Sequence, residues 1–401
     1  MIEQITLTPI HTARHSGEIS QHVYVRVDCD GVTGHGEISD LTDLPATMPD
    51  LSDLEAVLNE VFVGLRESDL VRLNHVLDGL LGGRNDPGIY TGNIRCGVDA
   101  AFHDAAARRL GISVATLFGG PTRTSIRSCY PLFRCHNEED IDRLEARVEE
   151  LLERDFDCVR LYVGGDPDVD EEVVRRLHAK YGQRLTLQAY DLSNKLDRGP
   201  AVALLRRLLA IWEPMYVESV VPFGDLRGMA QVRNALNVPV SEHVGNIDEM
   251  LRLWQADAID IVNVAPTSVG SIREALFQFR LADQLGIRCI LSTTQGTSLA
   301  TALELQLGAS VVNVDFPTVS IGPLLYQADP CLEPIRYTGA TAHIPTGPGW
   351  GVEPDPEAVA RCQAPLTWQG YGFVTELPDH SDGSWRSRPS GGLPAAGMTK
   401  H

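Results

Sequence analysis

Two glutamates, each at the end of a short apolar run, are the residues best suited to chemistry in this chain. Glu218 ends the run 215–218 and Glu242 ends the run 238–242, with a helix-length segment between them. This is the repeat of a β-strand, a helix and the next parallel strand. Carboxylates that end two successive parallel strands face one common mouth, where a divalent cation would hold them together. The spacing therefore predicts a cation site, without identifying a substrate.

The elements that position these residues follow a regular alternation of strand and helix patterns. The candidate strands are residues 126–132, 158–163, 185–190, 215–219, 238–242, 260–264, 289–293 and 311–315. Eight short parallel strands with intervening helices predict a (β/α) barrel, whose right-handed crossovers carry every strand end to the same face. Residues 1–40 have strand patterns and residues 51–110 have helix patterns, which predicts a separate α+β domain before the barrel.

Composition and charge exclude several classes of protein. A chain of 401 residues with a net charge of −20 lacks the basic surface that binds nucleic acids or anionic membranes. No apolar run reaches the roughly 18 residues that cross a bilayer, and the N-terminal segment lacks a signal peptide's apolar core. The eight cysteines form no Cys-x-x-Cys pair. Most lie in apolar runs, which predicts reduced core thiols and a cytoplasmic location.

Four segments resemble a known family. Residues 34–37 (Gly-His-Gly-Glu) resemble a strand of its capping domain, and residues 97–120 resemble the helix and Leu-Phe-Gly-Gly turn that lead into its barrel. The strand ends at Glu218 and Glu242 resemble two of its three metal-ligand strands. Residues 345–351 resemble the return of the chain to the capping domain. On these segments the chain resembles the enolase superfamily, in its mandelate racemase and muconate lactonizing enzyme branch.

The resemblance implies an α/β fold, a modified TIM barrel (β/α)7β with an α+β N-terminal capping domain. The barrel would comprise residues 126–336. The capping domain would comprise residues 1–125, completed by about residues 337–375. Residues 380–401 are rich in Ser, Gly and Pro, which predicts a disordered tail. Members of the family are commonly oligomeric, so a homo-oligomer is expected.

The resemblance also implies a Mg²⁺ ion held by acids that end the third, fourth and fifth barrel strands. The ion would bind the substrate carboxylate and stabilise the enediolate that forms when a base removes the adjacent carbon-bound proton. Glu218 and Glu242 stand at two ligand positions, and Gln188 stands where the family has an aspartate. Gln188 would offer an oxygen without a charge, which weakens the site, and Asp191 is an alternative ligand. An ion pair in a loop is the alternative for the two glutamates.

The usual bases of the family are replaced in this sequence. The second strand has Arg160 and Tyr162 where the family has Lys-x-Lys, the sixth has Ala265 where one group has an aspartate, and the seventh has no histidine. Some acid-sugar dehydratases of the superfamily use an arginine–tyrosine pair. The resemblance therefore implies Tyr162 as the base, with Arg160 and the metal favouring its phenolate. In the alternative, Tyr162 lines the pocket and Arg160 binds a carboxylate through two hydrogen bonds.

Five further side chains are predicted to bind the substrate. Arg14 and His15 lie in a segment that closes over the barrel mouth in the family, although a solvated loop would have the same composition. His243 would donate to a substrate oxygen or act as an acid, although strand alternation turns it away from the direction of Glu242. Thr293 and Asp315 lie at the ends of the seventh and eighth candidate strands.

The favoured hypothesis is a Mg²⁺-dependent carbon–oxygen lyase, a dehydratase that acts on a hydroxylated carboxylate of the sugar-acid type. A racemase or epimerase ranks lower because it needs a base on each face of the α-carbon, and the second face has no candidate. The third hypothesis is a metal-poor family member that binds a small acid without the usual catalysis.

Overall fold

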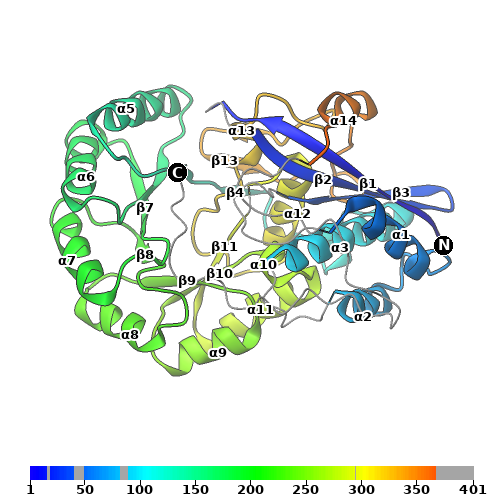
Figure 1. Ribbon diagram of the computed structural model, residues 1–401, viewed down its shortest axis with the longest axis horizontal. Helices are drawn as coiled ribbons and strands as arrows, with labels where there is room; N and C mark the ends of the chain where they lie inside the picture. The colour runs from blue at the N-terminus through cyan, green and yellow to red at the C-terminus, as the bar shows by residue number, and fades with distance from the viewer. Residues whose placement is uncertain (16–18, 40–48, 82–88, 294, 367–401) are drawn as a thin grey trace.

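The computed structural model describes residues 1–15, 19–39, 49–81, 89–293 and 295–366 (Figure 1). Its N-terminal part contains an antiparallel sheet in the order β1-β2-β3. These strands and the three helices that follow are β1 (Ile2–Ala13), β2 (Ile19–Cys29), β3 (Val32–Ile38), α1 (Leu51–Phe62), α2 (Leu70–Leu80) and α3 (Ile89–Leu110). Helix α3 packs along β3 and α1 packs on β1, so one face of the sheet is covered by helices.

Seven parallel strands form the second sheet, in the same order as in the chain. They are β5 (Tyr130–Leu132), β6 (Cys158–Tyr162), β7 (Thr186–Asp191), β8 (Tyr216–Glu218), β9 (Val240–Val244), β10 (Ile261–Val264) and β11 (Arg288–Leu291). The main helices of this part are α5 (Glu138–Glu153), α6 (Pro167–Tyr181), α7 (Arg198–Leu209), α8 (Leu226–Ala235), α9 (Ile247–Gln255), α11 (Ile272–Leu285) and α12 (Ser298–Ala309). In Figure 1, helices α5 to α9 form an arc outside the strands, as in a barrel.

The barrel is closed by an irregular segment in place of a regular eighth strand. The amide N of Asp315 donates to the carbonyl O of Cys289 at 3.0 Å, which joins this segment to β11. Thr318 forms a parallel bridge with Ser128, which joins the segment to the start of β5. The strand predicted over 311–315 is therefore displaced toward residues 315–318, and the (β/α)7β fold is confirmed.

Short elements complete the chain. They are β4 (Ser125–Arg127), β12 (Tyr337–Thr338), β13 (Thr341–His343), α4 (Val114–Leu117), α10 (Pro266–Val269), α13 (Gly322–Leu325) and α14 (Pro356–Cys362). Strands β12, β13 and β4 form a third sheet, so the run predicted as one strand over 126–132 is divided between two sheets. The domain limits stay a prediction. Residues 367–375 and the predicted disordered tail at 380–401 lie outside the described residues.

Side-chain caps determine where several barrel helices begin. Asn137, Asn246 and Ser271 precede α5, α9 and α11, and each side-chain oxygen accepts a hydrogen bond from the backbone N–H three residues on. Such caps satisfy N–H groups that have no partner within the helix. Loss of one cap lowers the stability by about 1 kcal/mol. Helix α11 ends at Gly286, whose φ of 72° is favourable only for a residue without Cβ.

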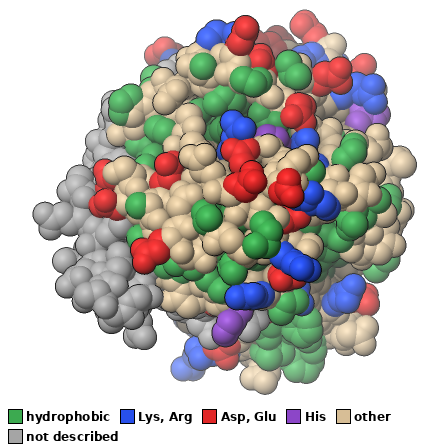
Figure 2. All heavy atoms as spheres, turned by 90° about the vertical axis from the view of Figure 1, so that its right-hand side faces the viewer, with side chains coloured by type: hydrophobic (Ala, Val, Ile, Leu, Met, Phe, Trp, Pro, Cys, Tyr) green, Lys and Arg blue, Asp and Glu red, His purple; other side chains and the backbone are tan. Residues whose placement is uncertain are grey.

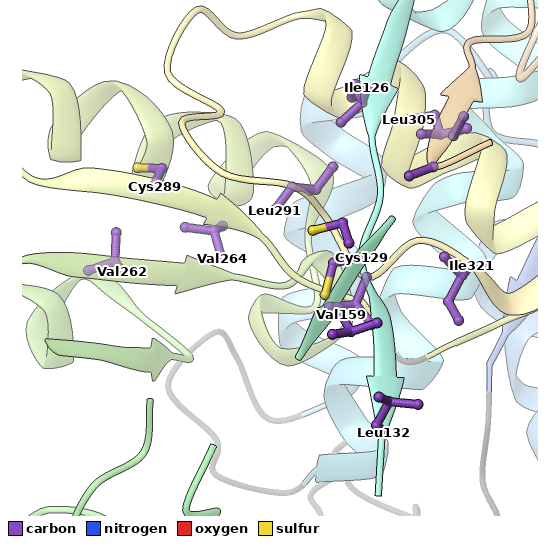
Figure 3. Packing of buried hydrophobic residues seen from close by; sticks show 14 of the residues in the cluster. Ile126, Cys129, Leu132, Val159, Val262, Val264, Cys289, Leu291, Leu305 and Ile321 are labelled. Carbon is purple, nitrogen blue, oxygen red and sulfur yellow. The ribbon is translucent and has the colours of Figure 1, made fainter. Parts of the chain in front are cut away.

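The N-terminal part and the barrel each contain a core of buried apolar side chains. One core comprises the barrel wall, its helices and the C-terminal segments, and Figure 3 shows part of it, with Ile126, Val159 and Leu291 converging from separate strands. A second core lies between β1–β3 and helices α1–α3. A small third cluster joins residues of β7, β8, β10 and β11 to Phe316, which requires it to lie inside the ring of strands.

Buried acids connect the N-terminal part to the barrel. Glu37 of β3 accepts from the backbone N–H of Thr297 at 3.1 Å, directly before α12. Asp99 of α3 accepts from the backbone N–H of Ile272 at 2.9 Å, at the start of α11. Each pair satisfies a helix N-terminus in the barrel with a carboxylate from the other part, where the helix dipole favours negative charge. The first of these contacts gives Glu37 a structural role.

Gly36→Ala is expected to destabilise the fold. A Cβ on Gly36 would lie 2.1 Å from the carbonyl O of Gly97 in α3, and overpacking of this kind costs about 1–3 kcal/mol. Gly79→Ala is the matched control, because a Cβ on this glycine of α2 meets no atom within 4 Å and should stabilise the helix by about 1 kcal/mol. The midpoints of urea unfolding measure both effects, and an unchanged midpoint for Gly36→Ala would contradict the close packing of α3 on β3.

The surface carries charges of both signs, and the cysteines are free thiols, as predicted for them. Acidic and basic side chains are interspersed over the face shown in Figure 2, which is the side of β1, α1 and α2. Among the described residues, no helix has the length and apolar character needed to cross a membrane. All eight cysteines are free thiols, and seven of them are buried.

Candidate functional site at the barrel mouth

The carboxyl ends of β6 to β9 bring several of the predicted residues to one level. Strand pairing places Tyr162 opposite Asp191, Asp191 opposite Glu218, and Glu218 opposite Ser241. Since all four strands are parallel, these positions lie side by side around the mouth of the barrel. The third-, fourth- and fifth-strand positions at this level are therefore an aspartate, a glutamate and a serine.

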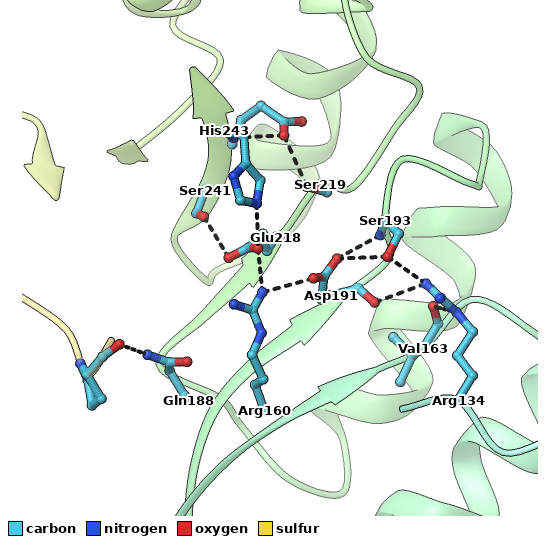
Figure 4. Close-up of polar contacts among 12 residues, drawn as sticks. Arg134, Arg160, Val163, Gln188, Asp191, Ser193, Glu218, Ser219, Ser241 and His243 are labelled. Atoms are coloured by element: carbon cyan, nitrogen blue, oxygen red, sulfur yellow. Dashed lines mark hydrogen bonds and ion pairs between the residues drawn. The ribbon is translucent and has the colours of Figure 1, made fainter. Parts of the chain in front are cut away.

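Arg160 lies between Asp191 and Glu218 (Figure 4). Its Nη2 donates to Asp191 Oδ2 at 2.9 Å and also to Glu218 Oε1. All three side chains are buried. The charge of a buried carboxylate must be compensated by a partner, and here one guanidinium compensates two.

This arrangement separates the pKa values of the two acids. Burial alone would raise the pKa of Glu218, but the charge of Arg160 and hydrogen bonds from His243 and Asn263 hold it well below its ordinary value. Burial raises the pKa of Asp191, and the nearby charge of Glu218 raises it further, against the opposing effect of Arg160. Glu218 is thus the acid that retains its charge most firmly.

His243 completes the centre from β9. Its Nε2 lies 3.2 Å from Glu218 Oε1, and its side chain is 42% exposed, so the ring reaches from the buried carboxylate to the open mouth. Burial would lower the pKa of His243, but the hydrogen bond and charge of Glu218 raise it above its ordinary value. A carboxylate that holds one ring nitrogen determines the tautomer and leaves the other nitrogen for proton transfer.

Glu242 points the other way, which corrects its predicted place beside Glu218. Its carboxylate accepts hydrogen bonds from Asn194 Nδ2 at 2.8 Å, Ser219 Oγ at 3.0 Å and the backbone N–H of His243 at 2.9 Å. Side chains alternate along a strand, and the inward positions of β9 are occupied by Ser241 and His243. Ser241 Oγ donates to Glu218 Oε2 at 3.3 Å, which confirms its inward direction.

A β-bulge determines which residue of β7 faces Arg160. Val159 pairs with Leu187 and Leu161 pairs with Tyr190, so β7 contains one residue more than β6 over this stretch. The extra residue breaks the alternation and turns Asp191 inward. Gln188 also points inward, but its Nε2 donates to the carbonyl O of Pro317 in the closing segment, and its Oε1 is buried without a partner among the described residues. Gln188 thus lies apart from the two acids that its predicted metal role requires.

Tyr162 is held in an aromatic and cationic environment. Its ring stacks on Phe133 with centroids 5.2 Å apart, and the guanidinium carbons of Arg160 and Arg134 lie 5.5 and 5.7 Å from its centroid. Burial raises the pKa of Tyr162, and the charges of Asp191 and Glu218 add to this, while Arg160 opposes it. These surroundings favour the protonated phenol, so they support Tyr162 as a proton donor better than as the base expected from the sequence.

Arg14 and His15 contact the segment of Leu325 and Tyr326. The guanidinium of Arg14 lies 5.9 Å from the centre of the Tyr326 ring, and Tyr326 Oη donates to the carbonyl O of Gln295, just beyond β11. Arg14 Nε donates to Ser20 Oγ at 2.7 Å, and the side chain is buried. His15 is exposed. Of the two, His15 is the more accessible to a ligand.

Thr293 and Asp315 occupy different ends of the barrel. Thr293 follows β11 at the mouth, where its hydroxyl donates to Glu304 Oε1. Burial raises the pKa of Glu304 to about 8, so this acid of α12 is protonated at neutral pH. Asp315 Oδ2 accepts from the backbone N–H of Cys289 at 2.8 Å, near the start of β11. Asp315 therefore lies toward the end of the barrel opposite the mouth, which corrects its predicted contact with substrate.

Four residues near the mouth were not predicted from the sequence: Phe133, Arg134, Asn194 and Ser241. Arg134 anchors the mouth by donating to Val163 O at 2.7 Å and to Ser193 Oγ at 3.0 Å. Phe133 is 54% exposed beside Tyr162, so it forms an apolar rim of the mouth. Their position directly after a strand pattern was an available signal, since residues that follow barrel strands line the active face.

Two models of known protein families match most of this chain. Residues 1–119 match the family model "Mandelate racemase / muconate lactonizing enzyme, N-terminal domain", and residues 143–358 match "Enolase C-terminal domain-like". The chain belongs to the mandelate racemase and muconate lactonizing branch of the enolase superfamily. The resemblance stated from the sequence is therefore confirmed.

Individual relatives of this branch support the same assignment. The chain is 30% identical to muconate cycloisomerase 1 of Rhodococcus opacus over 272 residues, which cover 66% of this chain and 70% of that protein. It is 24% identical to the L-Ala-D/L-Glu epimerase of Bacillus subtilis (strain 168) over 360 residues, covering 86% and 92% of the two chains. The solved structure of the muconate lactonizing enzyme from Pseudomonas putida superposes with a TM-score of 0.81 at 22% identity, covering 91% of this chain and 100% of that one. That similarity shows the fold.

Enzymes of this branch generally use Mg²⁺, but the side chains of this mouth do not fit the ion. Among the described residues, no three or more His, Cys, Asp and Glu side chains are grouped so that they would hold a metal. The free sides of Asp191 and Glu218 converge on Arg160, and Glu242 is directed elsewhere. A cation about 4 Å from the guanidinium would be repelled by about 4 kcal/mol per unit charge at an effective dielectric constant of about 20.

Proposed function

We propose that this chain is a carbon–oxygen lyase that acts on a small hydroxylated carboxylate, of the sugar-acid type, at the barrel mouth. The observation that carries the proposal is the buried Glu218 paired with the half-open His243, beside Arg160 and Tyr162. This centre combines a base, an acid and a cation. Membership of the superfamily and the relatives that act on small carboxylates support the same chemical class.

His243 is proposed as the base. Its neutral ring removes the proton on the carbon next to the substrate carboxylate, and Glu218 stabilises the imidazolium that forms. Oriented acid–base groups of this kind contribute about 10²- to 10⁴-fold to a rate. Glu218 suits this role because its low pKa keeps it charged over the whole neutral range.

Arg160 is proposed to receive the substrate carboxylate. Its Nη2 is engaged by the two acids, whereas its Nε is buried without a hydrogen-bond partner among the described residues. A buried donor without a partner costs free energy, which a carboxylate oxygen of the substrate would recover. The guanidinium charge then stabilises the enediolate as negative charge moves onto the carboxylate.

Tyr162 is proposed as the acid that completes the elimination. Its phenol donates a proton to the leaving β-hydroxyl, the carbon–oxygen bond breaks, and water departs as the carbon–carbon double bond forms. The proton held by His243 then returns to the phenolate directly or through water. For a 2,3-dihydroxy acid the enol product becomes a 2-oxo acid. No step is assigned to a metal because the donor set does not fit one.

The test is a screen of the purified chain against aldonic and aldaric acids, with and without Mg²⁺, using a carbonyl reagent that detects 2-oxo acids. The expected result is a 2-oxo product from at least one acid, with incorporation of deuterium at the former β-carbon in heavy water, where the enol takes up a solvent proton. Neither product nor deuterium incorporation across the library would contradict the proposal and favour a family member that only binds a small acid.

A second candidate is the cycloisomerisation of an unsaturated diacid, favoured by the muconate cycloisomerases among the relatives. That reaction forms a carbon–oxygen bond and in reverse is an elimination, so the same base and acid would serve it. Incubation with muconate, followed by ultraviolet absorbance and detection of a lactone, distinguishes it. Exchange at the α-carbon with inversion and without elimination would instead indicate an epimerase.

Other expectations from the sequence stay predictions. They are a homo-oligomeric assembly, a cytoplasmic location and substrate contacts by His15 and Thr293. His15 is exposed, and Thr293 follows the end of β11.

A further inference from the structure

We propose that the guanidinium of Arg160 takes the place of the divalent cation in this barrel, so that the mouth is independent of metal. The cation position implied by the family lies among the third, fourth and fifth strand ends. In this chain the inward residues there are Asp191, Glu218 and Ser241. A cation does lie between the two acids, and it belongs to the protein.

The contacts match those of a bound cation. One nitrogen, Arg160 Nη2, contacts Asp191 Oδ2 and Glu218 Oε1 together, as a metal ion bridges two carboxylates. The remaining oxygens of both acids are occupied too. Asp191 Oδ1 accepts from the backbone N–H of Ser193 at 2.7 Å, and Glu218 Oε2 accepts from Ser241 Oγ at 3.3 Å. Neither acid keeps an oxygen free of a donor for a metal ion.

The third ligand is removed by the same arrangement. The serine hydroxyl at the fifth-strand position adds no charge, and it acts as a donor to Glu218. Glu242 is held on the other side of β9 by Asn194, whose φ is 56°, and by Ser219, whose φ is 51°. Both residues adopt the left-handed conformation that is uncommon for residues with a Cβ, which indicates that the surrounding structure maintains this orientation.

Binding of Mn²⁺ alone tests the proposal without any substrate, so its outcome is separate from that of the lyase proposal. The wild-type chain, treated with EDTA and titrated with MnCl₂, is expected to bind no Mn²⁺ at the mouth, as measured by the paramagnetic resonance signal of the free ion. Its melting temperature should be equal in Mn²⁺ and in EDTA. Binding of one Mn²⁺ per wild-type chain that disappears in Glu218→Gln would overturn the proposal.

Arg160→Ala is expected to bind Mn²⁺, unlike the wild type. Removing the guanidinium frees Asp191 and Glu218 for a metal ion, so this variant should bind one Mn²⁺ and melt at a higher temperature in its presence. The same variant with Glu218→Gln should lose that gain. A folded Arg160→Ala chain that binds no Mn²⁺ would overturn the replacement.

Two further variants keep the test decisive. Arg160→Gln retains the polar volume of the side chain without its charge, and it substitutes for Arg160→Ala if the latter does not fold. Arg143→Ala is the matched control, because Arg143 pairs with Glu139 and Asp140 on the exposed face of α5 and its loss should create no Mn²⁺ site. Mn²⁺ binding by this control equal to that of Arg160→Ala would overturn the assignment to the mouth.

Discussion

His243→Ala is expected to lower the turnover of the substrate by about 10²- to 10⁴-fold, the range that a positioned acid–base group contributes. The ring joins the buried, charged Glu218 to the exposed mouth. Turnover and deuterium incorporation at the former β-carbon of the product should fall together, because both follow removal of the α-proton. Circular dichroism and the melting temperature verify that the variant folds.

The pH dependence of the wild type provides an independent check of this role. A base acts in its neutral form, and the pKa of His243 lies above its ordinary value of 6.5 because of Glu218, so the rate should rise with pH through a value above 6.5. His243→Gln should lose this rising limb. His343→Ala is the matched control, since His343 lies on β13 in a different sheet. Full activity in His243→Gln would contradict the assignment.

Glu218→Gln is expected to have the largest effect on stability. Removing one partner of a buried ion pair costs about 3–5 kcal/mol because the remaining charge stays buried. Asp191 still compensates Arg160 in this variant, so a loss of about 3 kcal/mol is expected in the free energy of unfolding at neutral pH. Urea unfolding followed by tryptophan fluorescence measures it.

Glu242→Gln is the matched control for this loss. It makes the same chemical change on the next strand, but Glu242 accepts hydrogen bonds from neutral donors. Its loss should be clearly smaller. The pKa of Glu218 is lower in the folded chain than its ordinary value of 4.5, so its stabilisation is complete above that pH and declines as the pH falls below it. The wild type and Glu218→Gln should therefore converge in stability in acid, and a constant difference would contradict the ion pair.

The sequence was sufficient for the fold because the fold depends on regular patterns. Strand and helix periods repeat from residue 126 onward, and the small residues Gly34 and Gly36 mark where β3 approaches α3. Hydrophobic periodicity and glycine placement are local features, so they can be recognised without knowing which distant residues are in contact. The eighth strand was misplaced because its bonds come from an irregular segment rather than from a periodic run.

The sequence could not predict which side chains at the strand ends point into the barrel. Glu218 and Tyr162 are the last residues of β8 and β6, whereas Glu242 and Arg160 lie within β9 and β6, two residues before the ends of these strands. Whether a side chain points into the barrel depends on register, and a shift of one residue reverses it.

The amino-acid sequence by itself therefore determined the family, the barrel and some of the polar residues near the strand ends. Only the tertiary structure decided how they combine. The bulge in β7 turns Asp191 inward, and the register of β9 turns Glu242 outward and His243 inward. The first places Arg160 between Asp191 and Glu218, and the second brings His243 to Glu218. The physical reason is that the register of a strand and the compensation of a buried charge both depend on residues that are far apart in the chain.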